Sequence, residues 1–324
     1  MSFVRWVLEE AQADGIKTLF FLARDGYILQ QIGQILAPVH FSSIECKYFY
    51  CSRYALRNAP KDIIAKYMVE EGMDADNIAI VDTGWLGTVQ RDIQEIRHSY
   101  FGKKDIIGYY FGMFTKGYPL SGTYKTYLFS PKKRWLWSFG FNANVFECLC
   151  AADHGMTIGY EEVEGRIAPK FKETIEKEMI KKETIEKKTI KKETIKLEKS
   201  SIAKLQIEAV LDYVTKNKET RFKTSDIKKR LKRFMQNPTI EEAKAYGKAP
   251  FAHDPKEQEI YPLADVADAS HIKNNLFFYR LLSKLTKRPV KPLYWIEGTA
   301  VLSGYTLGLE INLLHFSRLI KLQK

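Results

Sequence analysis

Short apolar runs alternate with helix-patterned segments through the first half of the chain. Apolar residues recur at helical spacing between consecutive runs, as in 28–36 and 89–96. The runs themselves have the length and composition of buried strands, and they are 17–23, 45–51, 78–81, 106–114 and 123–129. Strands joined by short helical connections form right-handed crossovers, so this order predicts an α/β fold with a Rossmann-like, mainly parallel sheet.

A pentapeptide repeat rich in lysine, glutamate, threonine and isoleucine separates the two halves of the chain. Its copies follow one another from Lys172 to Lys196. On an α-helix, isoleucines at every fifth residue advance by about 140° each, so they spread round the whole circumference and form no coiled-coil stripe. Pairs such as Glu173 with Lys177 would support a solvated helix. The repeat is therefore predicted to be a spacer that carries no chemistry.

Removal of the repeat, residues 172–196, is expected to leave the melting temperature almost unchanged. The reason is that the entropy of closing a connecting loop changes only slowly with the length of the loop. Thermal denaturation of the deletion variant beside the full chain measures the effect. A large fall in melting temperature would show that the repeat packs against the fold.

The last third of the chain is patterned as helices. Apolar residues recur at helical spacing in three segments, 202–213, 278–285 and 309–320. This part should therefore form a helical C-terminal subdomain that packs on the sheet or on a partner. Three parts are predicted in all: a Rossmannoid α/β domain over 1–160, the repeat spacer over 161–200, and a basic helical subdomain over 201–324.

The net charge of +12 is concentrated in the repeat and the C-terminal half. One segment there combines a cluster of cations with an apolar helical face made by Ile227, Leu231 and Phe234, and Ser225 is placed to cap it. Such a helix suits an anionic membrane surface, although most basic helical faces are simply solvated. No nucleic-acid-binding module accompanies it. The charge therefore argues against nucleic acid as the partner and leaves a peripheral membrane contact open.

Several features of the sequence indicate a cytoplasmic protein. The most apolar late stretch, 300–314, contains Glu310 and Asn312, so no membrane span is expected. The first ten residues carry three charges, unlike a signal peptide. The cysteines lack the spacing of a zinc knuckle, and we predict neither a disulfide nor a zinc site for them; they are Cys46, Cys51, Cys148 and Cys150.

Polar residues follow three of the predicted strands, where ligands bind in open α/β sheets. Asp25 and Asp82 stand at two of these strand ends, and a pair of carboxylates is what Mg²⁺ uses to hold a substrate phosphate. Arginine side chains and backbone N–H groups at glycines would bind the phosphate itself. The candidates for phosphate or substrate binding are Arg24, Gly26, Ser52, Arg53, Thr83, Gly84, Gly87 and Thr88. Each is also a common turn or cap residue, and only their coincidence at three strand ends favours a site.

Five segments carry a family resemblance: FFLARDGYIL, YFYCSRYALRNA, AIVDTGWLGTVQ, NVFECLCAADHGMTIGY and YWIEGTAVLSG. They resemble a family of bacterial hydrolases of the haloacid dehalogenase (HAD) superfamily, encoded among glycosyltransferases in surface-polysaccharide gene clusters. The resemblance covers most of the chain outside the repeat. It implies a HAD-like Rossmannoid fold, Mg²⁺-dependent phosphate-ester chemistry and a role in bacterial surface polysaccharide biosynthesis.

One position departs from the HAD signature. That signature ends a strand with D-x-D, in which the first aspartate is the nucleophile and the second is the general acid/base. The resemblance aligns the second aspartate with Asp25 and leaves Ala23 at the nucleophile, and alanine cannot form an aspartyl-phosphate. By the resemblance, Ser52 stands for the phosphate-binding serine of the second motif and Asp82 for the acidic metal ligand. No lysine is placed for the third motif, for which only Lys61 and Lys66 are available.

Two hypotheses of different classes follow. The first is an Mg²⁺-dependent hydrolase or transferase acting on a phosphorylated sugar or nucleotide sugar, with water as the nucleophile; Asp25 and Asp82 favour it. The second is a catalytically degenerate binding or scaffold protein for a phosphorylated glycan precursor or a glycosyltransferase, and Ala23 favours it. A phosphoribosyltransferase-like site ranks third, because its paired acidic motif is absent from IVDTG.

Overall fold

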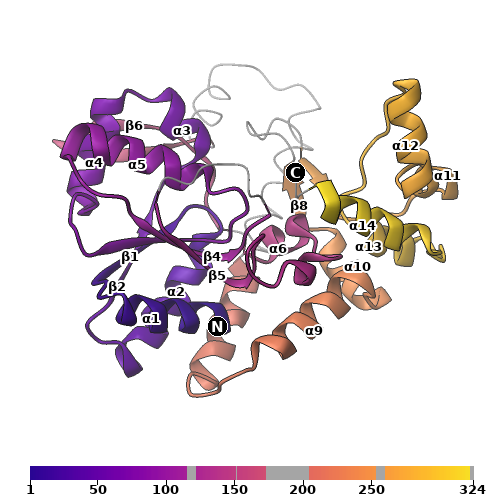
Figure 1. Ribbon diagram of the computed structural model, residues 1–324, viewed down its shortest axis with the longest axis horizontal. Helices are drawn as coiled ribbons and strands as arrows, with labels where there is room; N and C mark the ends of the chain where they lie inside the picture. The colour runs from indigo at the N-terminus through magenta and orange to yellow at the C-terminus, as the bar shows by residue number, and fades with distance from the viewer. Residues whose placement is uncertain (115–121, 151, 173–203, 253–259, 322–324) are drawn as a thin grey trace. The chain divides into compact units, whose positions relative to one another are not determined.

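The computed structural model describes residues 1–114, 122–150, 152–172, 204–252 and 260–321 (Figure 1). The chain divides into two compact units, each assembled from segments that are distant in sequence. Unit 1 consists of Met1–Met113, Tyr118–Tyr127 and Cys150–Arg221. Unit 2 consists of Phe114–Gly117, Leu128–Leu149 and Phe222–Lys324. The expected boundary at residue 160 falls inside a strand of unit 1, so this boundary does not separate compact units.

The centre of unit 1 is a five-stranded parallel sheet, which confirms the predicted Rossmann-like α/β class. Its strands are β1 (Thr18–Leu22), β2 (Glu45–Phe49), β3 (Ile78–Asp82), β4 (Ile107–Gly112) and β5 (Tyr124–Phe129). They lie in the order β2-β1-β3-β4-β5, so β1 pairs with β2 on one side and with β3 on the other. In a doubly wound sheet of this order, β2 is added on one side of β1 and β3 on the other. Ligands bind between β1 and β3, beyond the carboxyl ends of these two strands.

Helices cover both faces of the sheet (Figure 1). On one face lie α1 (Ser2–Ala13) and α2 (Gly26–His40), and on the other lie α3 (Arg53–Asn58), α4 (Lys61–Glu71) and α5 (Thr88–Phe101). The strands are therefore buried on both sides, and Phe20 and Phe21, on opposite faces of β1, are both fully buried. Burial on both sides explains why the strands are continuous apolar runs instead of alternating patterns.

A hairpin packs over α3 and α4 in unit 1. Its strands are β6 (Thr157–Val163) and β7 (Arg166–Phe171), which pair antiparallel. The hydroxyl of Tyr160 donates to the carbonyl oxygen of Tyr50 at 2.9 Å, and the backbone N–H of Ile167 donates to the carboxylate of Glu70 at 2.9 Å. The backbone N–H of Lys172 donates to the carbonyl oxygen of Met156 at 3.0 Å and so joins the two ends of the hairpin. Residues 161–172 of the predicted spacer thus belong to the fold, and the rest of it, 173–200, lies outside the described residues.

Unit 2 is mainly helical, as predicted for the C-terminal part. Its elements are η1 (Trp135–Ser138), α6 (Ala143–Leu149), α9 (Thr224–Gln236), α10 (Ile240–Gly247), β8 (Pro250–Ala252), β9 (Ile260–Pro262), α11 (Ala269–Asn274), α12 (Phe277–Thr286), α13 (Ile296–Leu302) and α14 (Glu310–Lys321). Trp295 is fully buried, and its indole N–H donates to the carbonyl oxygen of Met235 at 2.8 Å. The small β8–β9 ladder was not predicted, because three-residue strands leave no periodic signal.

The basic helix α9 differs from the prediction at its start. It begins at Thr224 with Lys223 at the N-cap position, so Ser225 lies inside the first turn and caps nothing. Its apolar face is used within unit 2, since the Phe234 ring lies 5.4 Å from Trp295 and 5.0 Å from Tyr246. None of the helices in the described ranges is long and apolar enough to span a bilayer.

Candidate functional site

The ends of β1 and β3 meet through one hydrogen bond in unit 1. Asp25 directly precedes α2, and Thr83 directly follows β3. The hydroxyl of Thr83 donates to Oδ2 of Asp25 at 2.7 Å, and Thr83 is only 1% exposed. The sheet order places these two strands side by side, so two of the three polar strand ends come together between β1 and β3, where the order of the strands reverses.

The environment of Asp25 favours its protonated form. Burial of the carboxyl raises the pKa of Asp25 above its ordinary value, while the hydrogen bond from Thr83 and the charge of Arg24 act in the opposite direction. Burial is the largest of these effects. A carboxyl group that keeps its proton at higher pH is suited to act as a general acid.

Two glycines allow the strand-end loops to approach the sheet closely. Gly84 has a φ of +135°, and a Cβ there would collide with the carbonyl oxygen of Gly112. A Cβ at Gly26 would lie 2.8 Å from the backbone carbonyl carbon of Phe21. The Ala23–Arg24 and Gly84–Trp85 peptide bonds in the same loops are cis. Both glycines therefore have a steric role, whether or not they also bind a ligand.

Two helices present their N-termini at these loops. α2 begins at Gly26 and α5 begins at Thr88, and in neither helix does a side chain cap the first turn. Gly87 takes the cap position of α5 with a φ of +70°, and neither first turn contains an acidic residue. In α2 the backbone N–H of Tyr27 already donates to the carbonyl oxygen of Arg24 at 2.9 Å, and the positive end of the helix dipole favours an anion at both N-termini.

The end of β2 is organised differently. Ser52 caps α3, because its hydroxyl accepts a hydrogen bond from the backbone N–H of Ala55 at 2.9 Å. The same hydroxyl donates to the carbonyl oxygen of Thr157 in β6 at 2.6 Å. Arg53, the first residue of α3, is exposed. The hydroxyl of Ser52 thus connects α3 to the hairpin, and this structural role accounts for a serine at position 52 without any bound phosphate.

Replacement of Ser52 by alanine is expected to lower the free energy of unfolding by ~1 kcal/mol or somewhat more, because loss of a serine N-cap costs about that much. Chemical denaturation measures the change. Arg53→Ala, which removes an exposed side chain from the next position, is the matched control and should be nearly neutral. If Ser52→Ala left stability unchanged and weakened phosphate binding instead, the serine would belong to the ligand site.

An aromatic wall, formed by Tyr27, Tyr48, Tyr50 and His154, borders Asp25. The hydroxyl of Tyr48 donates to Nε2 of His154 at 2.7 Å, and Nδ1 of His154 lies 2.9 Å from the carbonyl oxygen of Gly155. This arrangement requires the tautomer with its proton on Nδ1. The rings of Tyr27, Tyr48 and Tyr50 lie 5.1 to 5.5 Å from the imidazole.

Tyr48 is the member of this wall whose pKa responds to the charges of Asp25 and Arg24. Burial raises the pKa of Tyr48, the charge of Asp25 raises it further, and the charge of Arg24 lowers it. Tyr27 follows Gly26 in the first turn of α2, and its hydroxyl donates to Oδ2 of Asp153 at 3.4 Å. The sequence prediction missed the wall. Alternation along β2 does put Tyr48 and Tyr50 on one face, but nothing local connects that face to residues 153–154.

Asp82 lies at the end of β3, opposite Tyr110 of β4 in the parallel register. Burial raises the pKa of both Cys51 and Tyr110, and the negative charge of Asp82 adds to the effect in each case. Cys51 therefore stays a neutral thiol at ordinary pH, which makes it a poor nucleophile.

The carboxylates of the strand ends are compatible with Mg²⁺. A magnesium ion needs only one or two carboxylates when phosphate and water supply its other ligands. Within the part of the chain that the structure describes, the hydrogen bond to the Asp25 carboxyl goes to Oδ2, so Oδ1 is left for a ligand. The described residues contain no group of three or more His, Cys, Asp or Glu side chains suited to a metal. Asp25 and Asp82 are the two carboxylates at these strand ends that would hold such an ion.

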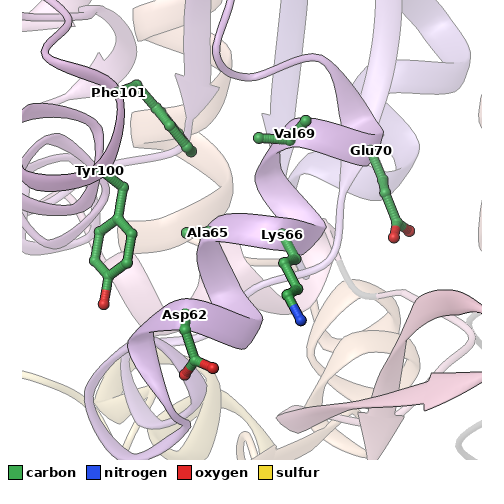
Figure 2. A pocket seen from close by; sticks show the side chains of 7 residues that line it. All are labelled: Asp62, Ala65, Lys66, Val69, Glu70, Tyr100 and Phe101. Carbon is green, nitrogen blue, oxygen red and sulfur yellow. The ribbon is translucent and has the colours of Figure 1, made fainter.

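A separate hollow of about 440 Å³ lies on α4 and the last turn of α5 (Figure 2). Asp62, Lys66 and Glu70 line it from successive turns of α4, and Tyr100 and Phe101 line it from α5. The end of α5 lies ~20 Å along the helix from Thr88, at a rise of 1.5 Å per residue. Lys66 therefore belongs to a solvated helix surface, and the Lys61 ammonium donates to the carbonyl oxygen of Leu56.

Comparisons of the chain with protein-family models and with curated proteins find no match. The functional assignment therefore rests on the residues of unit 1.

Proposed function

We propose that unit 1 binds and hydrolyses a phosphate ester at the ends of β1 and β3. The observation that carries the proposal is the hydrogen bond from Thr83 to Asp25, which joins the two strands where a doubly wound sheet binds ligands. The uncapped N-termini of α2 and α5 at the same loops support an anionic substrate. Arg24, adjacent to Asp25, adds a positive charge suited to phosphate.

Asp25 acts as the general acid in this proposal. Water attacks phosphorus because Ala23 offers no nucleophile, and the ester P–O bond breaks. The departing oxygen takes the proton from Asp25, and the resulting carboxylate accepts a proton released by the attacking water. The raised pKa of Asp25 supports the first transfer, and Thr83 orients the carboxyl for both.

A magnesium ion fits the same residues. Asp82, together with Asp25 once it is ionised, would hold it. When bound, the ion neutralises phosphate charge and orients the ester. The metal and the general acid make competing demands on Asp25, because a metal favours the ionised carboxylate and burial favours the protonated form. Activity measured against Mg²⁺ concentration at several pH values separates these roles.

The aromatic wall supports a phosphorylated sugar or a nucleotide sugar as the substrate class. Tyr27, Tyr48 and Tyr50 are partly exposed and pack edge to face against one another, and aromatic rings are surfaces on which the apolar face of a sugar or a base can pack. Asp153 is exposed at the edge of the wall and can accept hydrogen bonds from sugar hydroxyls. The proposed setting is bacterial surface polysaccharide biosynthesis, which the family resemblance alone suggests.

The test is a panel of phosphorylated sugars, assayed for release of phosphate, and of nucleotide sugars, assayed for release of the nucleotide, each with Mg²⁺ and with a chelator. We expect release from at least one sugar phosphate, dependent on Mg²⁺. Release that persists unchanged in the chelator would remove the metal from the proposal. No release from any member, with Mg²⁺-dependent binding retained, would favour the binding or scaffold protein that Ala23 also suggests.

A further inference from the structure

The apolar face of α12 in unit 2 is turned to solvent. Four apolar side chains recur there at helical spacing, and each is about half exposed or more: Phe278 (53%), Leu281 (48%), Leu282 (54%) and Leu285 (76%). A helix with this spacing ordinarily buries such a stripe against its own fold. No residue of α12 is buried. We call Phe278, Leu281, Leu282 and Leu285 the α12 stripe.

The other side of α12 anchors it to unit 2. Phe277 packs against the buried cluster of Leu276, Ile296 and Leu314. The guanidinium of Arg280 donates to Oδ1 of Asn275 at 3.1 Å. Figure 1 shows α12 extending beyond α11 and α14. The helix is therefore held in place at Phe277 and Arg280, and the α12 stripe is centred about 120° round the helix from the midpoint of these two anchors, at 100° per residue.

The segment of the chain that contains α12 carries charge of one sign. Residues 269–296 contain six lysines and arginines and no aspartate or glutamate. Five of these cations are exposed: Lys273, Lys284, Lys287, Arg288 and Lys291. None of the five forms an ion pair with a carboxylate of the described residues. The surface thus combines an apolar stripe with positive charges that pair with no carboxylate of the described residues. A partner that is apolar inside and negatively charged at its surface would be complementary to it.

We propose that α12 docks on an anionic lipid bilayer, with the α12 stripe inserted at the level of the headgroups. Interfacial helices gain affinity from buried apolar area and from attraction of cations to anionic lipids, and α12 supplies both. A second copy of the same surface would bring like charges together, which argues against self-association through it. α9 is the other basic amphipathic helix, but its Phe234 packs on Trp295 and is not available to lipid.

Vesicle flotation of the full chain tests the proposal. We expect the protein to float with vesicles of phosphatidylcholine and phosphatidylglycerol, to stay unbound with phosphatidylcholine alone, and to be released by high salt. The double variant Leu281→Ser, Leu285→Ser should bind at least about tenfold more weakly, because both side chains lose apolar area that the bilayer would cover. Both positions are exposed, so melting curves should match those of the wild-type protein.

Charge variants distinguish docking through α12 from general attraction of a basic protein. Lys284→Glu with Lys287→Glu should weaken binding to the anionic vesicles at least about tenfold. The matched control, Lys229→Glu with Arg230→Glu on the exposed side of α9, changes the net charge equally and should have little effect. Equal losses for the two pairs would overturn the proposal. So would absence of vesicle binding, and a dimer that dissociates in the Leu281→Ser, Leu285→Ser variant would assign the stripe to a second copy instead.

Discussion

Replacement of Asp25 by asparagine is expected to lower phosphate release by ~10²-fold or more, the usual loss when a positioned general acid is removed. Asparagine has the same shape and still accepts the hydrogen bond from Thr83, but it has no proton to transfer at this step. Steady-state rates with the best substrate of the panel measure the effect. Asp62→Asn on α4 is the matched control, because Asp62 lines the separate hollow and should not affect turnover.

The same variant should be more stable than the wild-type protein near neutral pH. Burial raises the folded-state pKa of Asp25, whereas the unfolded chain has an ordinary aspartate pKa of about 3.9. The wild-type protein therefore loses stability as pH rises from about 4 through the folded pKa, and asparagine avoids this loss. The advantage of the variant should shrink toward zero below about pH 4, where both side chains are neutral. Denaturation midpoints across pH measure it.

Two results would contradict this assignment of Asp25. Turnover that is present and unaffected by Asp25→Asn would place the chemistry elsewhere. A wild-type protein more stable than the variant at neutral pH would mean that the carboxylate is favoured by its surroundings, as expected for a resident metal ligand and not for a general acid. Thr83→Val adds a check. Loss of its hydrogen bond should raise the pKa of Asp25 further, so the fall in rate on the alkaline side of the pH–rate profile should occur at higher pH.

Gly84→Ala is expected to produce the largest loss of stability among the site variants, about 3 kcal/mol or more. The added Cβ would meet the carbonyl oxygen of Gly112 on the neighbouring strand, and the φ of +135° disfavours any side chain. Because backbone occupies both sides of the collision, no side chain can move to relieve it. Urea denaturation of the variant and the wild-type protein measures the effect.

Gly102→Ala is the control that separates steric collision from backbone conformation. Gly102 ends α5 with a φ of +60°, and nothing lies within 4 Å of the position of a Cβ there. Its replacement should cost only ~1 to 2 kcal/mol, the penalty of a left-handed conformation. Equal losses of stability at the two glycines would show that the loop after β3 relaxes freely. The close approach of Gly84 to Gly112 would then not fix the position of this loop.

The sheet was predictable because its physical cause is local in sequence. Strands covered on both faces become continuous apolar runs, and Phe20 and Phe21 are buried on opposite sides of β1. Alanine at position 23, which offers no nucleophile, is likewise visible from one residue. The polar strand ends at Asp25 and Thr83 were also visible, because a ligand site in such a sheet lies where strands end.

Only the tertiary structure decided which of these residues meet. The strand order placed β3 beside β1, which brought Thr83 to Asp25, whereas Ser52 became the cap of α3. His154 reaches Tyr48 from 106 residues away, a distance that no local pattern encodes. Periodicity also failed to decide the fate of α12, because helical spacing shows that a face is apolar and not what covers it. Leu285 has the spacing of a core residue and is 76% exposed, since burial depends on what the rest of the chain places against a helix.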